Sequence, residues 1–183
     1  EALVTAIGTV LASQAAEIVA AVPPFVTVVA LFVDEPAESI RRILGSVPVD
    51  LLQFHGEEPA TFCEQFQRPW MKALRVQADM DLVAHCRQYH TARAVLLDSW
   101  QEGVPGGTGR TFDWDLARGE LPLPVVLAGG LDAGNVGEAV TRLRPAAVES
   151  RCHRYSRPVR CMRNRTKNKT RNKTAASNCA DFL

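Results

Sequence analysis

The sequence predicts an α/β fold, and specifically a (β/α)8 barrel. Six apolar runs of strand length follow one another from residue 26 to residue 148, starting 24, 20, 24, 30 and 22 residues apart. These runs are continuously apolar instead of alternating, which is typical of parallel strands covered on both faces. Segments with helical periodicity lie between them, so strand and helix alternate as in βα units. A doubly wound open sheet is the alternative architecture.

The predicted elements follow one another in a regular order. The strand-like runs are VTVVALFV from Val26, DLLQFHG from Asp50, WMKALRV from Trp70, AVLLD from Ala94, PVVLAGG from Pro124 and AAV from Ala146. A weaker strand pattern, AIGTVL at 6–11, precedes a helical segment at 13–22, and Pro23-Pro24 ends that helix. Apolar residues at i, i+3, i+4 and i+7 predict two further helices, at 40–47 and 136–143. With the weak first strand, the count comes close to eight units.

The charge distribution divides the chain near residue 150. Residues 151–183 hold ten Lys/Arg and one acidic residue, for a net charge of +9, whereas residues 1–150 carry a net charge of −8. Three of the five cysteines, Cys152, Cys161 and Cys179, also lie in this last part. We therefore expect a barrel domain at 1–150 and a basic, low-complexity tail at 151–183 that is disordered or out of frame.

No membrane or secretion signal is recognisable in the sequence. It has no run of about 18 apolar residues, and its first apolar stretch lacks a basic flank. We expect a cytoplasmic protein with no membrane partner. Cys152, Cys161 and His153 fit no established metal-ligand spacing, so no metal site is expected.

Several predicted strands end in polar residues or glycines, where a barrel places its chemistry. Gln53 and His55 end one strand, Asp98 ends another, and a Gly-rich loop that includes Gly106 and Gly107 follows Asp98. Gly129 and Gly130 lead into a helix that starts at about Asp132 to Asn135, and a glycine pair before a helix N-terminus is typical of phosphate sites. The sequence therefore predicts a small phosphorylated ligand.

Three motifs in register resemble the phosphoribosylanthranilate isomerase family of (β/α)8 enzymes of tryptophan biosynthesis. They are LLQFHGEE, the LLDS and GVPGGTGRTFDW block, and VVLAGGLDAGNV, and the resemblance covers residues 13–148. It implies a cofactor-free Amadori rearrangement of N-(5-phosphoribosyl)anthranilate to 1-(2-carboxyphenylamino)-1-deoxyribulose 5-phosphate.

The resemblance also implies roles for individual residues. Asp98 matches the acid that protonates the furanose ring oxygen. The remaining matched positions are expected to bind substrate: Gln53, His55, Gly106, Gly107, Gly129, Gly130 and Asn135. No nucleic-acid partner is expected, and the resemblance leaves the oligomeric state open.

The sequence departs from the family pattern at both ends. The Lys-Ile-Cys-Gly strand that carries the family's general base is absent, as are the Ser-Pro-Arg loop and the Asp-Val-Ser-Ser-Gly-Val-Glu segment after the last strand. Cys63 and Cys86 lie in helical segments and do not replace the base. The departures imply an N-terminally truncated barrel with a missing first strand, a replaced last βα unit and two unpaired strand edges that favour association.

Two classes of function therefore stay open at this stage. One is a phosphoribosylanthranilate isomerase of doubtful activity, and the other is a non-catalytic barrel remnant or a basic-tailed protein that binds polyanions. The ordinary structural interpretations also stand: Asp98 could cap the next segment, His55 could be a hydrogen-bonded strand end, and Lys72 and Arg75 could form a salt-bridged lining or a solvated edge.

Overall fold

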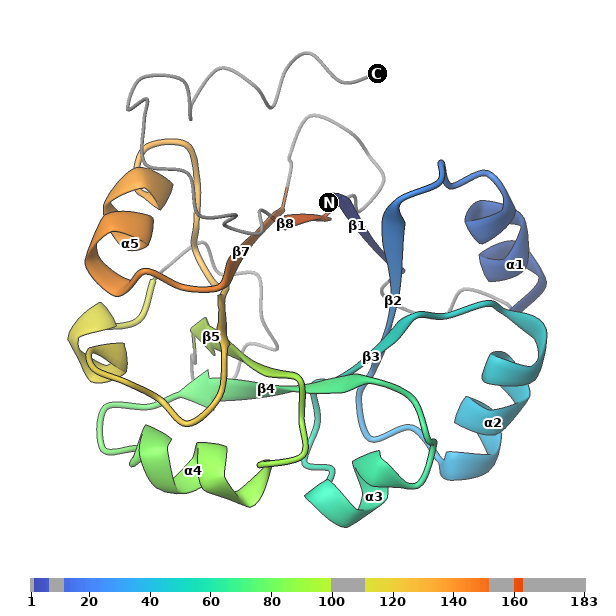
Figure 1. Ribbon diagram of the computed structural model, residues 1–183, viewed down its shortest axis with the longest axis horizontal. Helices are drawn as coiled ribbons and strands as arrows, with labels where there is room; N and C mark the ends of the chain where they lie inside the picture. Colours follow the sequence, from blue (N-terminus) through green and yellow to red (C-terminus); the bar gives the residue numbers. More distant parts are fainter. Residues whose placement is uncertain (1, 7–11, 100–110, 152–159, 163–183) are drawn as a thin grey trace.

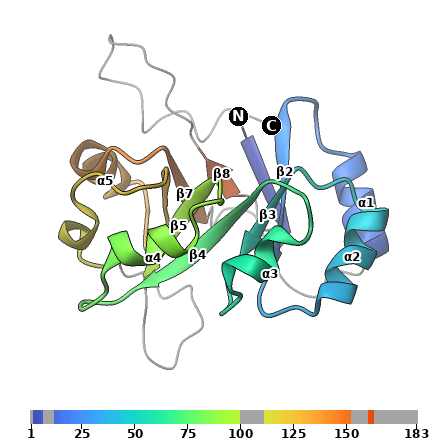
Figure 2. The ribbon, with the colours of Figure 1, turned by 60° about the horizontal axis from the view of Figure 1, so that its bottom comes forward.

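The computed structural model describes residues 2–6, 12–99, 111–151 and 160–162. Eight strands form a closed barrel in which each strand pairs with its neighbours in chain order. Figure 1 shows the helices on the outer side of this ring, and the turned view in Figure 2 shows α1 and α2 on one side of the strands and α4 and α5 on the other. The predicted α/β barrel class is confirmed.

Seven of the strands are parallel and the eighth closes the ring. The parallel strands are β1 (Ala2–Ala6), β2 (Val26–Phe32), β3 (Leu51–Phe54), β4 (Trp70–Val76), β5 (Ala94–Ser99), β6 (Val125–Leu127) and β7 (Ala147–Arg151). The closing strand, β8 (Arg160–Met162), pairs antiparallel with both β7 and β1.

Helices connect the parallel strands, and three of them overlap the helical segments predicted at 13–22, 40–47 and 136–143. They are α1 (Ala12–Ala20), α2 (Ala37–Ser46), α3 (Ala60–Glu64), α4 (Leu82–Gln88), the 3-10 helix η1 (Trp114–Ala117) and α5 (Val136–Leu143). Ile40 of α2 and Ala139 of α5 are fully buried, as expected for residues on the apolar faces of these helices.

The structure adds to one expectation and corrects another about the ends of the barrel. The first described strand starts at Ala2, ahead of the run predicted at 6–11, and pairs over five residues with Val26–Ala30; residues 7–11 lie outside the described residues. The two strand edges that were expected to be unpaired both pair with β8, in a stretch where the sequence predicts no element. Strand pairing uses backbone N–H and C=O groups, so a polar segment without an apolar pattern can close the ring.

Alternate residues of each strand belong to two separate apolar layers. The barrel interior is filled by small and medium side chains: Val29, Met71, Ala73, Leu96, Val126, Ala128 and Ala147. The other face of the strands packs under the helices, where the fully buried Phe54 lies 5.8 Å from Phe66 and 6.2 Å from Trp70 between ring centroids. This alternation determines which residues at the strand ends face the mouth of the barrel.

Candidate functional site

Polar side chains replace apolar ones where the inward-facing positions reach the carboxyl ends of the strands. Gln53 lies two residues beyond the interior residue Leu51, and Asp98 lies two beyond Leu96. Arg75 is the register partner of Asp98 on the neighbouring strand β4. Because residues two apart on a strand share a face, these side chains converge on the mouth of the barrel.

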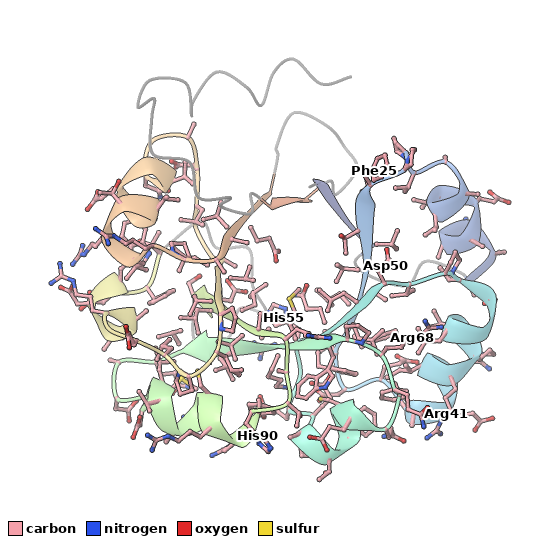
Figure 3. All side chains as sticks on the ribbon, in the orientation of Figure 1. Phe25, Arg41, Asp50, His55, Arg68 and His90 are labelled. Carbon is pink, nitrogen blue, oxygen red and sulfur yellow. The ribbon has the colours of Figure 1, made fainter. Side chains whose placement is uncertain are left out.

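His55 and Asp98 form the central pair of this mouth. His55 Nε2 lies 3.3 Å from Asp98 Oδ2, and the two side chains are 13% and 17% exposed. On the other side of the imidazole, His55 Nδ1 lies 3.2 Å from Nε2 of Gln53, a residue with no exposed surface. In Figure 3 His55 is labelled on the inner side of the ring of strands, whereas Arg41 and His90 lie at its outer rim. The acid thus has a buried hydrogen-bonded chain behind it and partial access to solvent.

Neighbouring strands hold the backbone of His55. Its N–H donates to Phe32 O at the end of β2 (2.8 Å), and its carbonyl accepts a long hydrogen bond from Arg75 Nη2 (3.4 Å). The backbone of His55 is therefore attached to both strands that flank β3. This attachment limits how far the imidazole can move relative to Asp98.

A buried ion pair supports the turn that follows His55. Lys72 Nζ donates to Glu58 Oε2 (2.8 Å) and to Gly56 O (2.6 Å), and the Lys72 and Glu58 side chains are 2% and 3% exposed. The Glu58 carboxylate also accepts hydrogen bonds from Asp34 N (2.8 Å) and Gly56 N (2.9 Å). The buried Lys72–Glu58 pair and the backbone hydrogen bonds to the same carboxylate together hold the loop that follows His55. The salt-bridged interpretation of Lys72 is thereby confirmed.

Gly129 contacts the carboxylate of Asp98 from the next strand along the barrel. Asp98 Oδ1 accepts a hydrogen bond from Ser99 N (2.9 Å), and Gly129 has φ +77°. A Cβ atom on Gly129 would lie 2.6 Å from Asp98 Oδ1 and 2.5 Å from Ser99 N. Such distances are closer than real Cβ contacts, so only glycine leaves Asp98 in its place.

We expect Gly129→Ala to lower both the free energy of unfolding and any activity of Asp98. Strain at a left-handed backbone position costs about 1–3 kcal/mol, and the clash also displaces the carboxylate. Gly119→Ala is the matched control, since Gly119 has φ +107° but open space around a Cβ. Thermal unfolding and turnover of both variants check this. Equal turnover in the two variants would contradict the claim that the absence of a side chain at Gly129 keeps Asp98 in place.

The loop after β6 is organised by Asp132 and Asn135. Asn135 Nδ2 donates to Gly130 O (2.8 Å), its Oδ1 accepts from Asp132 N (2.9 Å), and Asp132 Oδ1 accepts from Gly134 N (2.7 Å). Gly130 has φ +62°, which side chains rarely adopt. These bonds organise the loop that joins Gly130 to α5, and Asn135 is the N-cap residue of that helix. Contact of these residues with a phosphate stays a prediction.

Cys63 and Cys86 are buried in helices away from the mouth of the barrel. Burial raises the pKa of the Cys63 thiol to about 12, with a smaller opposing effect from Lys72. Burial likewise raises the pKa of Cys86. Since the thiolate is the reactive form, neither group is a general base near neutral pH.

We expect Cys63 and Cys86 to resist a thiol-specific disulfide reagent at pH 8 while the chain is folded, and to react fully after denaturation. The experiment uses a variant in which Cys152, Cys161 and Cys179 are replaced by serine, so that only the two buried thiols report. Rapid labelling of either thiol without loss of fold would contradict this prediction.

The structure brings most of the predicted site residues together. Gln53, His55 and Asp98 form one hydrogen-bonded chain, Gly129 contacts Asp98, and Gly130 and Asn135 belong to the same loop. Gly106 and Gly107 lie outside the described residues. Sequence reasoning missed Glu58, although a lysine within the apolar run WMKALRV signals that a buried anion must accompany it.

Other features of the described residues lie away from this site. A hollow of about 270 Å³, lined by Leu121, Pro124, Leu143 and other residues, lies at the opposite, amino-terminal ends of β6 and β7. No group of three potential metal ligands is found in the described part of the chain. None of the described helices is both long and apolar enough to cross a membrane.

Comparison with known proteins gives one consistent result. The family model "N-(5'phosphoribosyl)anthranilate (PRA) isomerase" matches residues 3–149. The N-(5'-phosphoribosyl)anthranilate isomerase of Alcanivorax borkumensis is 56% identical over 140 residues, which are 76% of this chain and 64% of that protein. The chain thus spans somewhat less than two thirds of the length of this relative.

Solved structures agree with the sequence comparison. The phosphoribosyl anthranilate isomerase of Thermotoga maritima has a TM-score of 0.65 and 33% identity, over 76% of this chain and 68% of that one. A second such structure, in complex with reduced 1-(o-carboxyphenylamino)-1-deoxyribulose 5-phosphate, has a TM-score of 0.62 and 30% identity, over 76% of this chain and 66% of that one.

Proposed function

The chain belongs to the phosphoribosylanthranilate isomerase family, and we propose that it catalyses the Amadori rearrangement of N-(5-phosphoribosyl)anthranilate in tryptophan biosynthesis. The product is 1-(2-carboxyphenylamino)-1-deoxyribulose 5-phosphate. The observation that carries this proposal is the His55–Asp98 pair at the carboxyl end of the barrel, in which Nε2 and Oδ2 lie 3.3 Å apart, with the glycine pair of the β6–α5 loop beside it. The same proposal places the protein in the cytoplasm.

Asp98 is the general acid of the proposed reaction. Its carboxyl proton moves to the furanose ring oxygen while the bond from that oxygen to C1 breaks, which opens the sugar to an imine. A base then removes the proton from C2, and the electrons of that bond form the enamine that becomes the ketose. Partial burial of Asp98 limits competition from water, and its hydrogen bonds to His55 and Ser99 fix the direction of the carboxyl group.

The phosphate of the substrate is assigned to the loop after β6. The two successive positive φ values at Gly129 and Gly130 turn the backbone at the start of the loop that leads to α5, and a helix N-terminus favours a negative charge. This location puts the phosphate on the β6 side of Asp98. The sugar ring then lies over the acid.

The base is assigned to none of the described thiols. Cys63, with a pKa of about 12, is fully protonated at neutral pH, and Cys86 is a buried helical residue with a raised pKa. No Lys-Ile-Cys-Gly motif is found in the sequence. We therefore assign Asp98 as the acid and the strand-end residues to substrate binding, and assign the base to neither Cys63 nor Cys86.

Growth complementation tests the proposal. We expect the chain to restore growth without tryptophan to a bacterial strain that lacks phosphoribosylanthranilate isomerase, and Asp98→Asn to fail at equal expression. A folded, expressed chain that does not support growth would favour the non-catalytic alternative.

A further inference from the structure

Gln53 is the most deeply buried of the polar residues described at the mouth of the barrel. The residue has no exposed surface, and Nε2 contacts His55 Nδ1 at 3.2 Å. Among the described residues, Gln53 Oε1 has no hydrogen-bond partner. The contact with His55 Nδ1 is thus the side-chain hydrogen bond that the structure gives this buried amide.

The contact determines which ring nitrogen of His55 carries the proton. An amide nitrogen has hydrogens and no available lone pair, so it donates, and His55 Nδ1 must accept. A neutral imidazole has one acceptor nitrogen and one N–H, so the proton lies on Nε2. Nε2 is the atom that faces Asp98 Oδ2 at 3.3 Å. The orientation of one amide therefore makes His55 a hydrogen-bond donor to the acid.

We propose that Gln53 is a positioning residue, which fixes the Nε2–H tautomer of His55 and through it the orientation of the Asp98 carboxyl group. This inference rests on the proposed isomerase function for its catalytic consequence, but not for the tautomer itself. The sequence predicts that Gln53 contacts the substrate. In this proposal Gln53 instead contacts His55 and acts on Asp98 through it.

The consequence for Asp98 follows from its two fixed donors. His55 Nε2–H donates to Oδ2, and Ser99 N–H donates to Oδ1 at 2.9 Å. Rotation of the carboxyl group would break both bonds at once. A proton carried by Asp98 must therefore occupy a lone pair that neither donor uses, which restricts the direction in which the acid can deliver it.

The backbone on either side of Gln53 is held firmly enough for this role. Gln53 pairs in register with Leu31 of β2 and Met71 of β4, and His55 N–H donates to Phe32 O. The imidazole and the amide are thus carried by one short segment whose strand neighbours are fixed. The tautomer is selected by the rigid barrel and does not depend on a mobile loop.

The tautomer is measured by nitrogen NMR of the imidazole rings in the full chain. Chemical shifts of Nδ1 and Nε2 distinguish a protonated ring nitrogen from an unprotonated one, and His55→Asn identifies the signals of His55 among the four histidines. We expect a neutral ring with Nε2 protonated. A neutral ring with Nδ1 protonated would overturn the proposal, because the amide would then be reversed.

Gln53→Glu and Gln53→Leu test the cause. The carboxylate introduced by Gln53→Glu only accepts, so we expect it to draw a proton to Nδ1 of His55 and to abolish the neutral Nε2–H signature. Gln88→Glu adds the same charge on the exposed face of α4 and is expected to leave the His55 signals unchanged. Unchanged His55 signals in folded Gln53→Glu would overturn the proposal.

Turnover separates this inference from the proposed function. For an active chain, we expect Gln53→Leu to lower kcat about 10- to 100-fold with little change in KM, as for other partners that orient a functional histidine. Equal kcat in folded Gln53→Leu and the unmodified chain would overturn the positioning role. A chain without turnover but with the Nε2–H signature, lost in Gln53→Glu, would contradict the proposed function and support the tautomer assignment.

Discussion

Replacing Lys72 with methionine is expected to lower the free energy of unfolding by about 3–5 kcal/mol. The substitution keeps the length of the side chain and removes its charge, so the carboxylate of Glu58 stays buried at 3% exposure without its counter-ion. The hydrogen bond from Lys72 to Gly56 O is lost as well. Denaturant unfolding monitored by circular dichroism measures the change.

Two comparisons make this prediction specific to the buried pair. The double variant Lys72→Met with Glu58→Gln removes the stranded charge and is expected to recover part of the lost stability. Arg118→Met removes the cation of an exposed pair, in which Arg118 and Asp115 are 60% and 48% exposed, and is expected to cost about 1 kcal/mol or less. A Lys72→Met variant as stable as Arg118→Met would contradict the account of the pair.

Asp98→Asn is expected to lower the rate of isomerisation about 10²- to 10⁴-fold. Asparagine keeps the shape of the side chain, and its single carbonyl oxygen can keep one of the two contacts, with His55 Nε2 or with Ser99 N–H. It has no acidic proton to give to the ring oxygen. Steady-state kinetics of the two proteins measure the ratio of kcat values.

Binding shows whether the loss is chemical. We expect Asp98→Asn to bind reduced 1-(o-carboxyphenylamino)-1-deoxyribulose 5-phosphate nearly as well as the unmodified chain, as measured by calorimetry. Asp79→Asn, which removes an exposed carboxylate of the loop between β4 and α4, is the matched control and should change neither rate nor binding. Full activity of Asp98→Asn would remove Asp98 from the mechanism.

Much of the barrel could be predicted because its parallel strands are buried on both faces. Runs such as WMKALRV and AVLLD are largely apolar, and each lies within one residue of the observed strand ends. The helices α2 and α5 were recognisable from apolar residues at helical spacing, which is the pattern of one face packed on a sheet. Burial requires apolar residues at these positions, so the strands and helices that are buried could be recognised from the sequence.

The closure of the ring could not be predicted because the closing strand has no apolar pattern. Strand β8 is only three residues long, Arg160–Met162, and is joined through backbone pairs such as Leu3 with Arg160 and Ser150 with Cys161. Such pairing makes no demand on side-chain polarity. A stretch rich in basic residues therefore carried no recognisable strand pattern.

The sequence predicted which residues lie at the site, but not which of them contact one another. Residues at strand ends were recognisable because a polar side chain or a glycine pair followed an apolar run, as at His55, Asp98 and Gly129. Sequence alone offers no means to place Glu58 against Lys72, since that contact depends on the three-dimensional return of the chain. Gln53 and His55 are two residues apart on one strand, so a shared face could be expected for them, but not which of their atoms meet. Long-range pairing of buried polar groups has no local signature.

The central claim is that this barrel mouth is a working isomerase site, and the decay of phosphoribosylanthranilate fluorescence tests it most directly. The purified, folded chain is mixed with the substrate, and the decay is compared with the uncatalysed background at the same pH. The account predicts a faster decay that scales with protein concentration. A decay equal to the background at every protein concentration would contradict it and would leave a folded barrel that shares the ancestry of the family without its activity.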